Sequence, residues 1–114
     1  MKIAIPLFHE RVSPYFGASS RLLLVDTRGA TLQQEAIWDV DGEGPMEIAR
    51  RLVDLGVEML VCGGISHFYK EWLARKGVTV MDNKKGIARQ VMQKFLTEHK
   101  DIFPGKTPCN RHKF

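Results

Sequence analysis

An apolar strand pattern that stops at a cysteine and passes through two glycines into a helix pattern constrains the fold more than any other segment. Residues 58–62 read Glu-Met-Leu-Val-Cys, and residues 63–67 read Gly-Gly-Ile-Ser-His. Short buried strands that alternate with helices are typical of α/β folds with parallel strands. In such sheets ligands bind outside the carboxyl ends of the strands. Residues 62–67, which we call the elbow, therefore lie where a ligand site is expected.

The second half of the chain repeats this alternation. Pro45 suits the first turn of a helix, and Gly56 ends the helical apolar spacing that follows it. A further helix is expected from a cap at Ser66 to Gly77. Residues 78–81 then form the next strand, and an apolar stripe after them predicts a last helix.

The first half of the chain is rich in strand patterns. Residues 2–6 predict a short buried strand broken at Pro6, and residues 9–20 form a polar, turn-rich stretch too long for a simple hairpin. Residues 21–26 are a second apolar run, which residues 27–29 connect to a third strand as an antiparallel hairpin. We therefore expect an α/β fold with a mixed five-stranded sheet, helices on both faces and the order β-β-β-α-β-α-β-α.

The length of 114 residues and the distribution of charge predict one domain followed by a tail. Residues 1–99 hold 13 basic and 12 acidic side chains, whereas residues 100–114 hold four basic side chains and one acidic side chain. We expect residues 1–99 to form a single α/β domain and residues 100–114 to be a basic, flexible C-terminal tail. A basic tail can bind nucleic acid or an anionic cofactor, but such a tail is more often a solvated terminus, and the charge alone identifies no partner. We expect no nucleic-acid partner.

Hydropathy and cysteine content indicate the compartment. No apolar run approaches the roughly 20 residues of a membrane-spanning helix, and the N-terminal residues lack the long apolar stretch of a signal peptide. The two cysteines, Cys62 and Cys109, are too few for a disulfide framework and fit a reducing compartment. We therefore expect a cytoplasmic protein that binds no membrane.

Several polar segments are expected to meet at one edge of the sheet. If the first strand runs parallel to the strands that end at Cys62 and Met81, the carboxyl ends of all three lie together. That edge would collect His9, the loop of residues 13–17, the elbow and residues 82–83. The sequence therefore predicts a site built from loops that are distant in the chain.

Cys62 has two interpretations. A cysteine at the end of a buried strand is often an inert apolar side chain. The amides of a helix N-terminus would instead favour its thiolate, and Gly63 and Gly64 would let a ligand approach the backbone. His67 is close to Cys62 in the sequence, so the two side chains could share a ligand, or His67 could be an exposed residue of the first helical turn with no role.

Other residues are weaker candidates for metal binding. Cys109 and His112 have a Cys-x-x-His spacing, which supplies two of the four protein ligands of a closed zinc site and suits a transient ligand arm. His9 directly follows the first strand, in a loop position. The chain contains no full G-x-G-x-x-G or Walker-type pattern, so a nucleotide enzyme is not expected.

Two segments of the chain resemble those of a known family. Residues 1–6 and the Arg-Val-Ser-Pro-Tyr-Phe-Gly of residues 11–17, together with residues 56–65 and their Cys-Gly-Gly-Ile, are similar to the dinitrogenase iron-molybdenum cofactor biosynthesis family. That family includes NifX-like proteins and the C-terminal domain of NifB. The resemblance runs from Met1 to about Leu96. It implies a ribonuclease H-like fold without nuclease activity.

The resemblance also implies a function and a set of site residues. It implies a non-enzymatic carrier of an iron-sulfur or iron-molybdenum-type cofactor or precursor, acting in metallocofactor assembly for nitrogen fixation. Its partners would be assembly or acceptor proteins, and it would be a monomer or a weak homodimer. The expected metal ligands are Cys62, His67, His9, Cys109 and His112. The expected cofactor-binding residues are Ser13, Tyr15, Phe16, Gly17, Gly63, Gly64 and Ser66.

The chain departs from this family at two places. Relatives often carry histidine where this chain has Tyr15, and more glycine where it has Ser66 and His67. We hypothesise that the missing imidazole has moved, because His9 and His67 would flank the same cleft.

Two other functions stay open. The chain could be a thiol-dependent enzyme in which His67 activates Cys62, with Asp82 as a nearby third group. A thiol pKa near the ordinary value of about 8.5 would disfavour this hypothesis. Alternatively, the chain could be a small regulatory or protein-interaction domain, in which the elbow is only structural and the tail docks a partner.

Overall fold

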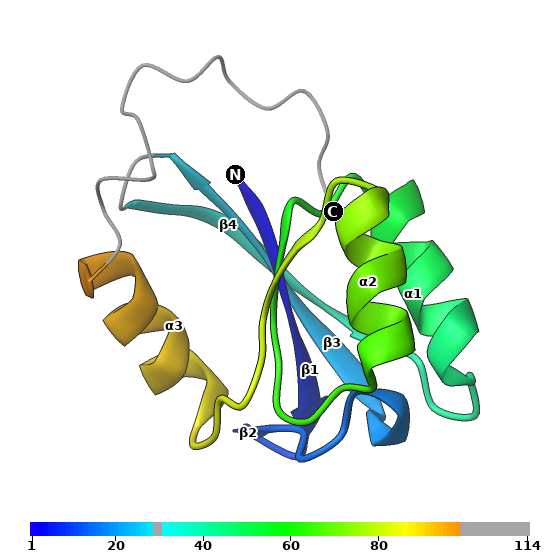
Figure 1. Ribbon diagram of the computed structural model, residues 1–114. Helices are drawn as coiled ribbons and strands as arrows, with labels where there is room; N and C mark the ends of the chain where they lie inside the picture. The colour runs from blue at the N-terminus through cyan, green and yellow to red at the C-terminus, as the bar shows by residue number, and fades with distance from the viewer. Residues whose placement is uncertain (29–30, 99–114) are drawn as a thin grey trace.

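The computed structural model describes residues 1–28 and 31–98, which form a mixed sheet with helices on both faces (Figure 1). The elements are β1 (Lys2–Phe8), β2 (Arg11–Val12), a 3₁₀ turn η1 (Phe16–Ala18), β3 (Arg21–Arg28), β4 (Thr31–Asp39), α1 (Pro45–Asp54), β5 (Met59–Val61), α2 (His67–Arg75), β6 (Thr79–Met81) and α3 (Ala88–Glu98). The six-stranded sheet has the order β4-β3-β1-β5-β6, and β2 pairs with β1 beside this path.

Most elements form where the sequence predicts them. β3 and β4 are an antiparallel hairpin, and β1, β5 and β6 run parallel to one another. α1 begins at Pro45, and α2 follows Ser66. Gly56 and Gly77 lie just after these helices with φ angles of 78° and 90°, which residues with a Cβ rarely adopt. The predicted helices on both faces of the sheet are confirmed, while the ribonuclease H-like classification stays a prediction.

The sheet has six strands instead of the predicted five, and the first strand does not end at Pro6. The pairs between β1 and β5 end at Ala4 and Leu60. Alternate residues of a strand direct their backbone groups to the same edge, so Pro6 faces the side that β5 has left. The carbonyl oxygen of Pro6 there accepts a hydrogen bond of 2.8 Å from the amide of Ser13. The missing N–H of proline is therefore not needed by a neighbouring strand.

Residues 9–20, which as a whole are too long for a simple hairpin, begin with the turn and second strand of a short one. Phe8 pairs with Arg11, which leaves only His9 and Glu10 in the turn between β1 and β2. His9 has a φ of 58°, in the left-handed region. Its ring packs edge-on against Phe8, with ring centroids 4.6 Å apart. The two residues of β2 give no periodic signal, so the sequence pattern could not show the strand.

Replacing His9 with glycine should stabilise this turn. A residue with a Cβ loses about 1–2 kcal/mol in the left-handed conformation, and glycine does not. We expect His9→Gly to raise the free energy of unfolding by about 0.5–1 kcal/mol in urea titrations. Asn83→Gly is the matched control, because Asn83 has a φ of 60° but asparagine tolerates this region better. A loss of stability in His9→Gly would mean that the contact between His9 and Phe8 outweighs the backbone strain.

Two apolar clusters fill the space between the sheet and its helices. The cluster under α3 includes Ile3, Ile5, Val25, Val61 and Phe95. The cluster under α1 and α2 includes Ala4, Leu24, Leu52, Cys62 and Leu73. Neighbouring residues of β1 thus enter opposite clusters, as expected for a strand buried on both faces. Helices therefore pack against both faces of the sheet, and the loops that follow the strands lie at its edges.

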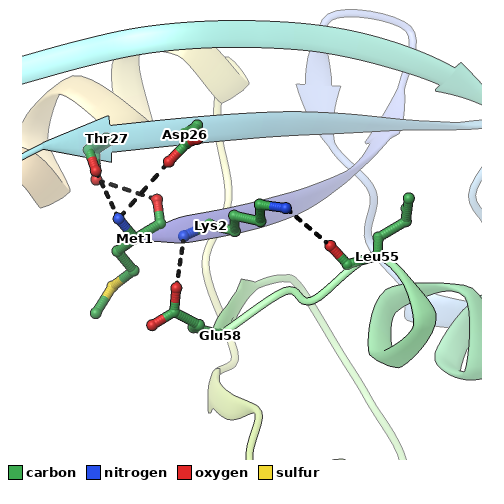
Figure 2. A network of polar contacts seen from close by, with 6 residues as sticks. All are labelled: Met1, Lys2, Asp26, Thr27, Leu55 and Glu58. Carbon is green, nitrogen blue, oxygen red and sulfur yellow. Dashed lines mark hydrogen bonds and ion pairs between the residues drawn. The ribbon is translucent and has the colours of Figure 1, made fainter. Parts of the chain in front are cut away.

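Polar contacts fix the start of β1 at the amino edge (Figure 2). The ammonium group of Met1 donates to the carbonyl oxygen of Thr27 and lies 3.8 Å from the carboxylate of Asp26. Lys2 is only 1% exposed, and its Nζ donates to the carbonyl oxygen of Leu55 at 3.3 Å, just after α1. A cation is favourable at the carboxyl end of a helix. The buried Lys2 therefore has a structural role far from the elbow.

The predicted basic tail, residues 100–114, lies outside the described residues. The division into a domain of residues 1–99 and a tail stays a prediction. Among the helices of residues 1–28 and 31–98, none has the length and apolar character needed to span a membrane.

Candidate functional site

Two loops from distant parts of the chain are joined by backbone hydrogen bonds at the carboxyl edge of the sheet. The amide of Gly64 donates to the carbonyl oxygen of Pro14 at 2.7 Å, and the amide of Phe16 donates to the carbonyl oxygen of Gly64 at 2.8 Å. Tyr15 and Gly64 form a parallel bridge between these bonds. The prediction that residues 13–17 and the elbow share one edge is confirmed.

The segment after β6 joins the same edge. The amide of Asn83 donates to the carbonyl oxygen of Gly63 at 2.9 Å, and the amide of Lys84 donates to that of Cys62 at 2.9 Å. Lys70 of α2 donates to the carboxylate of Asp82 at 3.1 Å. The hydrogen bond from Lys70 holds the pKa of Asp82 below its usual value. Residues 82–83 therefore meet the elbow as predicted, and Asp82 is a carboxylate paired with a cation.

The two glycines of the elbow make room for the neighbouring loop, whereas the sequence suggested room for a ligand. A Cβ on Gly63 would lie 2.4 Å from the carbonyl oxygen of Ser13 and 2.7 Å from that of Pro14. A Cβ on Gly64 would lie 3.3 Å from the ring of Tyr15. The oxygens beside Gly63 belong to the backbone and cannot move aside easily. We call this packing of residues 13–16 on Gly63 and Gly64 the loop clamp.

A hollow of about 440 Å³ lies beside the loop clamp, at the N-terminus of α2. Its walls are mainly apolar, and the ring of Tyr69 packs against Phe16 with centroids 6.2 Å apart. The amides of the first turn of an α-helix have no partner within the helix, so this end of α2 carries partial positive charge. The hollow is lined by Tyr15, Phe16, Gly17, Pro45, Gly64, Ile65, Ser66 and Tyr69.

The structure buries Cys62, the leading candidate ligand. Its side chain is 0% exposed and belongs to the apolar cluster under α1 and α2. Burial, together with the smaller effect of the charge of Asp82, raises the pKa of the thiol from 9.0 to about 12, although Lys70 offsets part of the increase. The expected stabilisation of a thiolate by the helix N-terminus is thus outweighed by desolvation. Cys62 is a protonated core residue in this conformation.

The two histidines among the described residues, His9 and His67, lie on the surface. His67 is exposed, and its Nε2 lies 3.1 Å from the carboxylate of Glu71 one turn later. His9 is exposed at the tip of the β1–β2 hairpin. Neither of these histidines lines the hollow.

The donor atoms do not form a complete ligand set. Cys109 and His112 lie outside the described residues. Within residues 1–28 and 31–98, no three His, Cys, Asp or Glu side chains gather as a metal would require. The described donors therefore do not fit a cluster that is held permanently by several protein ligands.

Five of the seven predicted cofactor-binding residues line the hollow, and two do not. Ser13 and Gly63 belong to the loop clamp, and Ser13 is buried with its hydroxyl donating to the carbonyl oxygen of Tyr15 at 2.8 Å. The remaining predicted residues line the hollow. Sequence reasoning missed three residues of its lining, Pro45, Ile65 and Tyr69. Pro45 and Tyr69 carried only helix signals in the sequence, so nothing linked them to the loop of residues 13–17.

Comparisons with known proteins agree on the fold. A family model described as "Dinitrogenase iron-molybdenum cofactor" matches residues 1–98. No protein of curated function matches the chain. Solved structures of similar fold include PH0822, the apo form of the orange protein and a Thermotoga protein. PH0822 is 24% identical with a TM-score of 0.81, and the match covers 86% of this chain and 90% of that one.

The other two structures are also similar over most of the chain. The apo form of the orange protein from Desulfovibrio gigas is 21% identical with a TM-score of 0.70, covering 85% of this chain and 88% of that one. A Thermotoga protein provisionally assigned as NifB is 23% identical with a TM-score of 0.64, covering 87% of this chain and 89% of that one. At this level of identity the likeness shows the shared fold.

Proposed function

Because this chain belongs to the dinitrogenase iron-molybdenum cofactor family, we propose that it is a non-enzymatic carrier that binds and releases a metal-sulfur cluster as cargo. The family implies a role in the biosynthesis or binding of the iron-molybdenum cofactor. The finer proposal is that the cargo is an iron-sulfur or iron-molybdenum-type cluster or precursor. Exchange with assembly or acceptor proteins and a cytoplasmic location belong to the same proposal.

The hollow at the N-terminus of α2 is the observation that carries this proposal. Metal-sulfur clusters are anionic and accept N–H hydrogen bonds at their sulfur atoms, and their surroundings control access of solvent. The first turn of α2 offers backbone amides and partial positive charge, while Tyr15 and Tyr69 supply a largely apolar wall. The hollow therefore combines electrostatic attraction with an apolar wall.

An incomplete ligand set suits a carrier better than a resident cofactor. A cluster held by several thiolates is released only slowly, because each metal–sulfur bond must break. Here Cys62 is buried and protonated. His67 is an exposed donor that directly follows Ser66, a residue of the lining of the hollow. We propose that contact with the walls and with backbone amides holds the cargo, and that His67 adds at most one metal bond. Cys109 and His112 stay predicted auxiliary ligands.

Filling the hollow should prevent uptake of cargo. Ser66 is exposed at the helix N-cap and lines the hollow, so the indole of Ser66→Trp can occupy the space without entering the core. The full chain is incubated anaerobically with ferrous iron, sulfide and molybdate and then separated by gel filtration. We expect Ser66→Trp to retain at least about fivefold less protein-bound metal, which corresponds to about 1 kcal/mol or more of binding free energy.

Two further variants test whether the hollow itself holds the metal. Gln90→Trp places the same side chain on an exposed position of α3 and should retain as much metal as wild type. Cys62→Ala should also retain most of the metal, because the thiol does not reach the hollow. Equal uptake by wild type and Ser66→Trp, or complete loss in Cys62→Ala with an intact fold, would contradict the proposal.

A further inference from the structure

A second surface on the carboxyl edge combines exposed apolar and cationic side chains. Phe8 pairs with Arg11 across the β1–β2 hairpin, and Arg11 forms an antiparallel bridge with Ile87. Residues paired in this way have Cβ atoms about 4.5–5.5 Å apart on the same face. Phe8 is 50% exposed, Ile87 is 36% exposed, and Arg11 lies exposed between them. We call these three residues the docking row.

The docking row is fixed in place by the backbone beneath it. The amide of Val12 donates to the carbonyl oxygen of Gly86 at 2.8 Å, and the amide of Ala88 donates to that of Glu10 at 2.9 Å. On the opposite face, Leu7 and Val12 pair with each other inside the core under α3. One face of this small three-segment sheet is therefore buried, and the docking row occupies the uncovered face.

The charge around the docking row is positive. Lys84 and Lys85 are exposed just before Gly86, in the segment that carries Ile87. Within the described parts of the chain, no carboxylate forms an ion pair with Arg11, Lys84 or Lys85. The nearby Asp82 is paired with Lys70 of α2. Apart from Asp82, Glu10 at the hairpin tip is thus the acidic residue of the β1–β2 hairpin and of the segment that carries Ile87.

From this arrangement we propose that the docking row binds an acidic segment of a partner protein that inserts apolar side chains between the cations. Protein interfaces are enriched in aromatic residues and arginine at their centres, and an acidic partner would complement Arg11, Lys84 and Lys85. Nucleic acid fits less well, because its binding needs a row of phosphate contacts, and here apolar side chains stand on both sides of Arg11. The docking does not depend on what fills the hollow.

The test uses a fluorescein-labelled peptide of 12 residues that contains eight glutamates and four leucines. Fluorescence anisotropy measures how tightly this peptide binds to the full chain. We expect Arg11→Glu and Phe8→Ser each to weaken binding by at least about fivefold, and Ile87→Thr to weaken it about threefold. Binding should also weaken when salt is raised. A peptide with serine in place of leucine should bind less tightly.

Matched controls lie elsewhere on the surface. Arg50→Glu reverses an exposed cation on α1, and Leu32→Ser removes an exposed apolar side chain on β4. Both should bind the peptide within about twofold of wild type. Equal binding by all five variants, no binding by wild type, or tighter binding of a 12-base-pair DNA duplex with the same dependence on Arg11 would overturn the proposal. Circular dichroism of each variant shows whether the fold is retained.

Discussion

Gly63→Ala should lower the free energy of unfolding by about 3 kcal/mol or more. The added Cβ would overlap the carbonyl oxygens of Ser13 and Pro14, at 2.4 and 2.7 Å. Overpacking against side chains typically costs about 1–3 kcal/mol. Here the obstacle is buried backbone, so relief requires the loop of residues 13–16 to move and the bonds of the loop clamp to break.

Urea denaturation measures this effect, and Gly44→Ala is the control. The Cβ of an alanine at position 44 would have the carboxylate of Glu47 as its nearest neighbour, at an ordinary 3.5 Å. The backbone of Gly44 is extended, with a φ of −79°, which alanine adopts freely. We expect a change of less than about 1 kcal/mol there. If Gly63→Ala cost no more than Gly44→Ala, the loop clamp would not be a rigid feature of the fold.

The thiol of Cys62 should make the protein less stable in alkali. The pKa of the folded thiol is raised to about 12, against 9.0 for the free group, so the folded state keeps its proton where the unfolded state loses it. This contribution is complete below about pH 9 and is lost as pH rises towards 12. The free energy of unfolding should fall by up to about 1.4 kcal/mol per pH unit in this window.

Comparison with Cys62→Ala isolates this contribution, because lysines and tyrosines titrate in the same window. With Cys109→Ser as the common background, Cys62→Ala should show a shallower decline between pH 9 and 12. In the same background at pH 8, the folded protein should react with a disulfide reagent at least about 100-fold more slowly than the urea-unfolded chain. Rapid reaction of the folded protein would instead support the thiol-dependent enzyme that the sequence left open.

Local patterns in the sequence predict the elements that surround the site. Pro45 and Gly56 bracket α1, and the apolar runs on either side of residues 27–29 predict the β3–β4 hairpin. These features depend on residues close together in the chain, where turn chemistry and apolar spacing act directly. The shared edge of the elbow and residues 13–17 was also predictable, because it follows from the direction of parallel strands.

The sequence could not reveal what the elbow contacts. Gly63 and Gly64 looked suited to a ligand, yet their open sides are filled by Ser13, Pro14 and Tyr15 from a loop about 50 residues earlier. A glycine pattern shows that something approaches the backbone closely but not whether it is a ligand or the chain itself. The same limitation applies to Cys62, whose position in the chain suited both an apolar core residue and an exposed donor.

The parting of β1 and β5 has a consequence for how quickly anything could bind. Because β5 leaves β1 after Ala4, residues 13–16 fill the gap and continue the hydrogen bonding of the sheet into the wall of the hollow. A wall that is already part of the sheet is preorganised, so binding requires little ordering of the protein. Entry and release would then be governed by diffusion and surface contact, without a wait for a loop to open.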